Sequence, residues 1–395
     1  MIPSTRSYKR NWLRQLVLLS TLLFSYAHVG RALAAFNEAP VIYAGFAFAG
    51  DEHNREKLYP YSIEISSDVD LDKILREKLL SRPELAQKVS FEMSDGKLDQ
   101  SSVAFSLVQE TIETQIVDGK FLVIVTLQAN VLAFNRASKS VVATYPVRMR
   151  ATRALDAEPN RAELKEMVRE MYTASLAKDN IFDQWLSRFE KTRIREGAIK
   201  RLRVTNITVT PEADRVIVDA GKNVASIQDQ TAKFLESAVA ENFGIPMIPS
   251  SVGEAIGKKM RLRFSDESTL DLSLPEPDLA LSFTIRDFVT KKLETTETTQ
   301  DIYRVKANIS MKNLGSERII LNEGVYDTNI VVLPKSAGSK LSDWDQYFKL
   351  MQALISKLGK QMANVSDEWL EESASRAMDA KPAFLNLKQE LLGLR

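Results

Sequence analysis

Three stretches of this chain recur further along it in the same order, and this repetition restricts the fold more than any other feature of the sequence. The pairs of similar segments are 71–80 with 231–240, 129–142 with 307–320, and 180–186 with 364–370. One short match could arise by chance. Three ordered matches with modest changes of offset indicate two copies of one domain.

The middle match contains a predicted strand in each copy. Apolar and polar residues alternate along 121–131 and again along 303–311. A period of two is typical of a strand with one buried face, and the alignment keeps the buried positions in register. The pair Asp118-Gly119 is a strong signal for a two-residue hairpin turn before the first of these strands. Each copy is therefore expected to contain a three-stranded antiparallel meander.

Helices are predicted after each meander. The first begins with Asn160 and Glu163 at the spacing of a capping box, and the second begins with Ser342 and Asp345 at the same spacing. Each copy then reads strand, helix, strand, meander and helices. We therefore expect an α/β fold of the layered α+β kind, in which two tandem copies of a mixed, largely antiparallel sheet carry helices on one face.

The predicted boundaries follow from the repeat and the two ends of the chain. They are a signal peptide at 1–34, a first α/β repeat domain at 35–197, a second at 198–375, and an amphipathic carboxyl-terminal tail at 376–395.

The phrase Asn-x-x-Asp-x-Trp-Leu occurs in both copies at the predicted start of a late helix. Asp183 and Asp367 are expected to be N-caps, since a carboxylate can accept hydrogen bonds from the free N–H groups of a first helical turn. Trp185 and Trp369 are expected to pack against the preceding helix. We interpret the phrase as a structural staple rather than a ligand site, because tryptophan contributes packing area first.

The amino terminus has the composition of a secretory signal peptide. Residues 1–15 carry four basic and no acidic residues, and an apolar stretch follows. Ala32 and Ala34 then form an A-x-A cleavage pattern. The apolar stretch is shorter than the ~20 residues that a spanning helix needs. We predict export to the bacterial periplasm with cleavage after Ala34, and an uncleaved amino-terminal anchor is the alternative.

Charge argues against nucleic acid as a partner. Removing residues 1–34, which hold five basic and no acidic residues, leaves 48 Lys and Arg against 52 Asp and Glu, a net charge of −4. Nucleic-acid binding requires a concentrated basic surface.

The scarcity of catalytic side chains argues against an enzyme. The chain contains no cysteine and two histidines, and His28 lies within the predicted signal peptide. His53 alone cannot build a histidine-based metal site, and without cysteine there is no thiolate chemistry or disulfide. We therefore expect no cofactor, no metal and no enzymatic activity.

Two surface features are candidates for binding. The stretch 191–203 is the most basic part of the mature chain, and it reads either as a solvated linker or as a contact for an anionic membrane surface. The residues proposed for that contact are Arg193, Arg195, Lys200 and Arg201. The tail after Pro382 carries apolar residues at helical spacing, so it folds back on its own domain or docks into a partner. The residues proposed for partner contact are Phe384, Leu387, Leu391 and Leu394.

The order of elements, together with stretches such as "LALSFTIRDF" and "YRVKANISMKN", resembles a group of bacterial envelope domains. The group includes the amino-terminal domain of TolB, the curli-secretion lipoprotein CsgG and the penicillin-binding-protein activator lipoproteins. The resemblance covers most of both copies and implies a non-enzymatic adaptor, assembly factor or channel subunit. This chain lacks the lipidation cysteine and a membrane-spanning hairpin pattern, which argues against a pore.

Two functions are expected from these observations. The first is a periplasmic interaction or assembly adaptor whose partner is another envelope protein. The alternative is a module that binds a small molecule or glycan in the cleft between the two repeats. The sequence does not indicate the partner or the oligomeric state.

Overall fold

The structure is a computed structural model that describes residues 40–50, 55–92, 100–117, 119–173, 179–192, 194, 201–250, 255–256, 259–334 and 342–393. The predicted signal peptide and its cleavage point lie outside these residues. Within the described ranges, no helix combines the length and the apolar character needed to cross a membrane.

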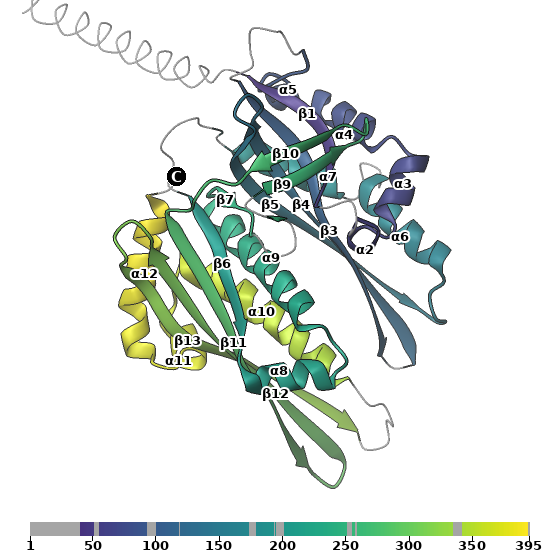
Figure 1. The fold of residues 1–395 in the computed structure, drawn as a ribbon. Coiled ribbons are helices and arrows are strands. Elements are labelled where there is room, and N and C mark those ends of the chain that lie inside the picture. Colours follow the sequence, from purple (N-terminus) through teal and green to yellow (C-terminus); the bar gives the residue numbers. More distant parts are fainter. Residues whose placement is uncertain are drawn as a thin grey trace, which may run out of the picture.

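The first half of the chain forms a strand, a group of short helices, a meander and two further helices (Figure 1). In order these are β1 (Val41–Ala49), α2 (Arg55–Leu58), α3 (Ser62–Asp68), α4 (Leu71–Leu80), α5 (Pro83–Ala86), β2 (Val89–Ser90), β3 (Ser101–Val117), β4 (Lys120–Asn135), β5 (Ser140–Leu155), α6 (Arg161–Thr173) and α7 (Ile181–Lys191).

The second half has a related order, with an added group of short strands before its meander. Its elements are β6 (Leu202–Val209), α8 (Pro211–Asp219), α9 (Val224–Phe243), β7 (Met247–Ile248), β8 (Ala255–Ile256), β9 (Lys259–Phe264), β10 (Thr269–Ser273), β11 (Leu279–Glu294), β12 (Thr298–Asn313), β13 (Ile319–Pro334), α10 (Asp343–Ala363), α11 (Asp367–Ser373) and α12 (Ala377–Leu392).

The two halves pair their main strands in the same way. β1 is parallel to β3 and β6 is parallel to β11, and each is followed by an antiparallel meander. A bulge interrupts the first meander between Leu107 and Gln109, and the second between Ile285 and Asp287, 178 residues later in each case. These observations confirm the α/β fold class. Descent of the halves from one duplicated domain is our interpretation of their shared geometry.

Each half has its own hydrophobic core between sheet and helices. In the first half Phe105 of β3 lies against Phe182 of α7, with ring centroids 5.1 Å apart. In the second half Phe288 of β11 lies 5.7 Å from Trp344 of α10. Alternate residues of the long strands supply the sheet side of both cores, as period-two patterning predicts.

The segment β8–β10 does not pack with the half of the chain that contains it. β9 runs antiparallel to β1, with Ala47 paired to Phe264. β10 pairs with β9, and Ser273 of β10 also pairs with Ser140 of β5. Strands β1, β3, β4, β5, β10 and β9 thus form a closed ring. The predicted domain boundary at 197/198 lies outside the described residues. That prediction assigned the segment β8–β10 to the second domain, whereas the segment completes the sheet of the first half.

The ring encloses a third apolar core, which contains residues from both halves. Its members are Ala47, Ala49, Ala104, Leu132, Phe134, Val141, Ile248, Met260, Leu262, Leu272 and Leu274. Because β7 also pairs with both β5 and β6, the described strands form one continuous 13-stranded sheet.

Candidate functional site

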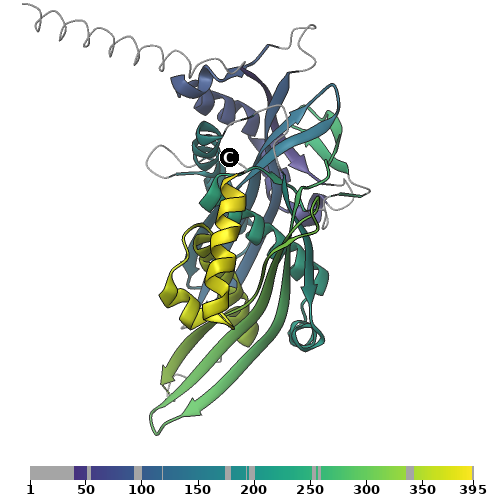
Figure 2. The ribbon, with the colours of Figure 1, turned by 90° about the vertical axis from the view of Figure 1, so that its left-hand side faces the viewer.

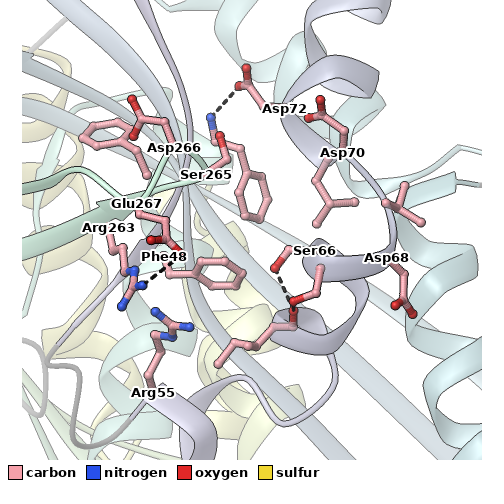
Figure 3. Close-up of a pocket in the computed structure, with 16 residues that line it drawn as sticks. Phe48, Arg55, Ser66, Asp68, Asp70, Asp72, Arg263, Ser265, Asp266 and Glu267 are labelled. Atoms are coloured by element: carbon pink, nitrogen blue, oxygen red, sulfur yellow. Dashed lines mark hydrogen bonds and ion pairs between the residues drawn. The ribbon is translucent and has the colours of Figure 1, made fainter.

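A cavity of about 550 Å³ lies where the β9–β10 turn meets the helices of the first half (Figure 3). Its lining comes from three segments that are distant in sequence. These are Phe46 and Phe48 of β1, Arg55, Ile63 and residues 66–72 around α3 and α4, and residues 263–267 of the turn. The cavity is therefore built from both halves of the chain.

Asp72, in the first turn of α4, fixes the cavity wall formed by β1. Its Oδ1 accepts hydrogen bonds from the Tyr43 hydroxyl at 3.0 Å and from the backbone N–H of Phe46 at 2.8 Å. These bonds span a bulge in β1. Gly45, within the bulge, has φ +102°, and a Cβ there would lie 2.9 Å from Asp72 Oδ1. Glycine is therefore required at this position by both its backbone angle and the available space.

The environment of Tyr43 keeps its hydroxyl protonated. Burial, together with the neighbouring Asp72 carboxylate, raises the pKa of Tyr43 far above its usual range. The hydroxyl therefore acts as a permanent hydrogen-bond donor that holds β1 against α4.

The acidic groups around the cavity are engaged by the protein itself. Asp70 is the N-cap of α4 and accepts a hydrogen bond from a backbone N–H of its first turn at 2.9 Å. Asp266 accepts from the backbone and the hydroxyl of Ser268, and these bonds hold the pKa of Asp266 below its usual range. Glu267 lies 3.6 Å from Arg263. These contacts order the cavity rim.

The lining combines an aromatic floor with a predominantly acidic rim. The rings of Phe46 and Phe48 lie 5.1 Å apart, and the Arg55 guanidinium lies 5.8 Å above the Phe48 ring. The charged residues of the lining are Arg55, Asp68, Asp70, Asp72, Arg263, Asp266 and Glu267. Such a cavity can hold a small molecule with an apolar part and polar groups. Within the described ranges, no three His, Cys, Asp or Glu residues are grouped so as to hold a metal ion.

A second candidate surface is formed by two hairpin arms, in which the long strands extend beyond the helices. The arms are the outer parts of β3–β5 and of β11–β13. Both run towards the lower end of the view in Figure 1, away from the end at which β1 begins, and Figure 2 shows the second arm from another side. Large apolar side chains on the arms are exposed, among them Ile116 at 63% and Leu293 at 40%.

The predicted N-caps of the repeated phrase are wrong. Asn180, not Asp183, is the N-cap of α7, and Asp183 is its reciprocal partner in a full capping box. The N-cap of α11 is Ser366, and Asp367 is the first residue of the helix. In each case the N-cap is an amide or hydroxyl residue just before the helix. Its side chain can reach the free N–H groups of the first turn because the residue itself lies outside that turn.

The two tryptophans contact different parts of the structure, and their packing on the preceding helix stays a prediction. The Trp185 ring is fully buried against Phe105 of the sheet, and its Nε1 donates a hydrogen bond to the backbone carbonyl oxygen of Asn130 at 3.0 Å. Trp369 contacts Phe384 of the following helix, with ring centroids 5.7 Å apart. Both rings serve packing, but the two copies use them differently.

The apolar tail is not a free surface for a partner. Phe384, Leu387 and Leu391 of α12 are 1%, 0% and 0% exposed and belong to the core of the second half. Partner contact through these three residues is therefore contradicted, because folding back buries them all. Leu394 lies outside the described residues.

The basic stretch is described only in part. Arg193, Arg195 and Lys200 lie outside the described residues. The backbone N–H of Arg201 donates to Asp278 at 2.7 Å and so ties the start of β6 to the loop before β11. Contact of this stretch with an anionic membrane surface stays a prediction.

The cavity residues were not identified from the sequence. Asp70 directly before the apolar positions of 71–80 indicates a helix start, which is what the structure contains. Nothing local connects this start with residues 263–267, which lie about 190 residues further along the chain and reach it through the pairing of β9 with β1.

Comparison with known proteins finds similarity only among solved structures. No protein-family model matches the chain, and no curated protein matches it. A minor lipoprotein from Acinetobacter baumannii is 12% identical over 42% of this chain and 90% of its own, with a TM-score of 0.21. A protein of family DUF330 from Xanthomonas campestris is 12% identical over 42% and 81%, with a TM-score of 0.18. A putative neuraminyllactose-binding hemagglutinin homolog from Helicobacter pylori is 12% identical over 45% and 88%, with a TM-score of 0.22.

Proposed function

We propose that this protein is a non-enzymatic, exported adaptor that binds another protein of the bacterial cell envelope through its two hairpin arms. The observation that carries this proposal is the exposure of large apolar side chains at the outer ends of strands whose inner ends are buried. Ile116 on the first arm and Leu293 on the second are in this position. On the second arm, Leu293 and Val332 both pair with Gln300 and therefore lie on the same face, where they are 40% and 52% exposed. Exposed apolar side chains that lie together in this way mark surfaces of protein–protein contact.

The direction of the arms supports the same proposal. They extend away from the end of the molecule at which β1 begins (Figure 1). If the segment before β1 holds the protein at a membrane, the arms would reach outward from that membrane. If the segment is cleaved, the arms are still the part of the molecule that projects furthest beyond the helices.

The test is site-specific photo-crosslinking in intact cells. A photoreactive phenylalanine analogue is placed at Ile116 or Leu293, and crosslinked proteins are identified by mass spectrometry. The matched control is Leu80, which is 51% exposed on α4 in the first half and away from both arms. We expect one envelope protein to be captured from the arm positions and not from Leu80. Equal capture from all three positions, or none, would count against the arms as the binding surface.

The cavity favours a second function, the binding of a small molecule. The specific observation is that two distant parts of the chain are brought together around about 550 Å³ with an aromatic floor. Native mass spectrometry of the purified protein would detect a retained molecule as added mass. Replacing Ser66 in the lining by Trp should remove that mass, whereas replacing Ser356, exposed on α10, by Trp should not.

A further inference from the structure

The outer part of the second arm carries an apolar patch on the face of its sheet that is turned away from α10. Residues paired across an antiparallel sheet point to the same face, and every second residue returns to that face. Phe288 and Tyr303 lie on the other face and contact α10. Among the aliphatic side chains of the patch, Leu293, Ile330 and Val332 are 40%, 56% and 52% exposed. The outer-arm patch, as we name it, consists of three rows of paired residues, which are Leu293 with Gln300 and Val332, Lys291 with Ile302 and Ile330, and Val289 with Arg304 and Thr328.

The charged side chains in the rows of the outer-arm patch are all positive. They are Lys291 and Arg304, and the first acidic residue inward on this face, Asp287, is paired with Lys306 at 3.0 Å. Arg304 is held in place, because its Nε donates a hydrogen bond to the hydroxyl of Thr328 at 3.0 Å. A fixed arginine loses little conformational freedom when it pairs with a carboxylate. The patch therefore fits a partner surface that is apolar and carries acidic groups.

The same face of the first arm is covered. The shift of 178 residues between the two bulges places Gln115 at the position of Leu293, and Ile124 at the position of Ile302. Gln115 is 7% exposed and Ile124 is 3% exposed, whereas Leu293 is 40% exposed and Ile302 is half-buried. The two arms therefore differ in what lies over this face and not in how their strands pair.

Helices of the second half provide the cover on the first arm. The guanidinium of Arg148, on β5, lies 5.2 Å from the ring of Phe234 on α9. Glu113 shares a row with Ile124, and Arg148 lies two rows further in on the same face. Burial raises the pKa of Glu113, and the charges that act on it include those of Asp345 and Lys349 on α10. On the second arm, the exposure of the outer-arm patch shows that no described element occupies the corresponding place.

We propose that an amphipathic helix of a partner protein, with acidic residues beside its apolar stripe, docks on the outer-arm patch. This inference rests on the proposed adaptor function and names the kind of segment that the second arm binds. Helices already cover the equivalent face of the first arm, and the positive charge of the patch selects acidic residues in the partner. A second copy of the chain cannot supply the same cover, because its α9 and α10 pack on its own first arm.

An anionic membrane is the other kind of surface that apolar and basic side chains fit. The tip of the second arm argues against it. Glu294 ends β11 and Glu297 directly precedes β12, so both acidic residues lie at the end of the hairpin that would enter a bilayer first. Anionic lipid head groups would repel them. The charges of the arm therefore favour a protein partner.

The test measures the binding of two labelled peptides to the purified protein by fluorescence anisotropy. Each peptide has about 18 residues, or about five helical turns, with leucine along one stripe of an alanine-rich helix. The first peptide carries glutamate beside the stripe, and the second carries lysine at the same positions. We expect the glutamate peptide to bind at least ~10-fold more tightly. Equal affinities, or no binding of either peptide up to about 1 mM, would overturn the proposal.

Lys291→Glu and Lys292→Glu are a matched pair of variants, because they change the net charge equally at adjacent exposed residues of β11. Lys291 lies in the outer-arm patch, whereas Lys292 pairs with Asp301 on the opposite face. Lys291→Glu should abolish the preference for the glutamate peptide, and Lys292→Glu should retain it. Thermal unfolding checks that both variants are folded. A preference that survives Lys291→Glu would mean that the peptide binds elsewhere.

Sedimentation with phosphatidylglycerol vesicles tests the membrane as the occupant. We expect the same fraction of protein with the vesicles before and after Lys291→Glu. Loss of vesicle binding in this variant would overturn the proposal in favour of a membrane surface.

Crosslinking from Leu293 in cells tests the adaptor function separately. The crosslinked site in the captured protein should lie in an acidic amphipathic helix. A partner captured through any other kind of segment would leave the adaptor function in place and overturn this inference. Selective binding of the glutamate peptide without capture in cells would support the patch and count against the adaptor function.

Discussion

At the scale of single residues, Gly359 is the position at which helix packing leaves least room. A Cβ there would lie 2.6 Å from the backbone carbonyl oxygen of Ala238, so α10 and α9 cross in close contact. Gly359→Ala should lower the free energy of unfolding by at least about 1 kcal/mol, because overpacking costs more than the gain in helix propensity. Urea unfolding measures this, with Ser356→Ala, an exposed change on the same helix, as the control. Equal stability of the two variants would show that the helices separate at little cost.

Glu323 is a residue at which pH should change stability. Its side chain is buried, one carboxylate oxygen has no hydrogen-bond partner in the described structure, and burial raises its pKa above the usual 4.5. The unfolded chain therefore loses this proton at a lower pH than the folded chain. Above about pH 4.5, the contribution of Glu323 to stability falls as pH rises through the folded pKa.

The variant Glu323→Gln removes this ionisation. Relative to the original chain, its free energy of unfolding should increase between about pH 4 and pH 8. Urea unfolding at the two pH values gives the difference, in which contributions from other titrating groups cancel. A difference that does not change with pH would mean that Glu323 ionises equally easily in both states.

At the scale of elements, replacing the aspartate of the repeated phrase should reduce stability by different amounts in the two halves. Asp183 completes the capping box of α7 and forms ion pairs with Lys78 and Arg82 at 2.8 and 3.1 Å. Asp367 is 66% exposed, and its ion pair is with Lys381 on the surface. Asp183→Ala should cost about 1–2 kcal/mol, and Asp367→Ala less than about 0.5 kcal/mol. Chemical denaturation of both variants decides this, and a larger loss from Asp367→Ala would contradict it.

Two leucines of α12, one buried and one exposed, test whether this helix packs on its own domain. Leu387 is fully buried, whereas Leu385, on the same helix, is 45% exposed. Leu387→Ala should lower the free energy of unfolding by about 2–5 kcal/mol, because it leaves a cavity in the core. Leu385→Ala should change it by less than about 1 kcal/mol. Similar small effects of both changes in thermal unfolding would show that α12 is detached from its domain in solution.

At the scale of the whole molecule, the closed ring of strands predicts that the two halves unfold together. Leu262 of the second half and Leu132 of the first belong to the same core. Leu262→Ala should therefore lower the midpoint of urea unfolding for the first half as well, where Trp185 lies. With Trp344 and Trp369 replaced by Phe, fluorescence of Trp185 reports that half, once the amino-terminal segment with Trp12 is removed.

The test compares the urea unfolding transitions that two different signals report. Trp185 fluorescence and far-ultraviolet circular dichroism should give one transition at the same urea concentration, and Leu262→Ala should shift both. Two separate transitions, with the fluorescence one unmoved by Leu262→Ala, would mean that the halves are independent domains.

Much of the local structure could be predicted from the sequence. Alternation along 121–131 and 303–311 identified β4 and β12, and Asp118-Gly119 identified the hairpin, since Val117 pairs with Lys120 across it. Capping errors of one to three residues arose because several polar residues precede each helix, and the choice among them depends on backbone angles.

The sequence by itself predicted the strands of the two meanders and the helices that follow them, because these depend on patterns within about ten to twenty residues. Only the tertiary structure decided where β9 and β10 lie. Met260, Leu262 and Leu272 alternate with polar residues as in any half-buried strand, and that pattern does not specify which sheet edge the strand joins. The choice is made by apolar partners in the first half of the chain, more than 100 residues away, and it creates both the ring and the cavity beside it.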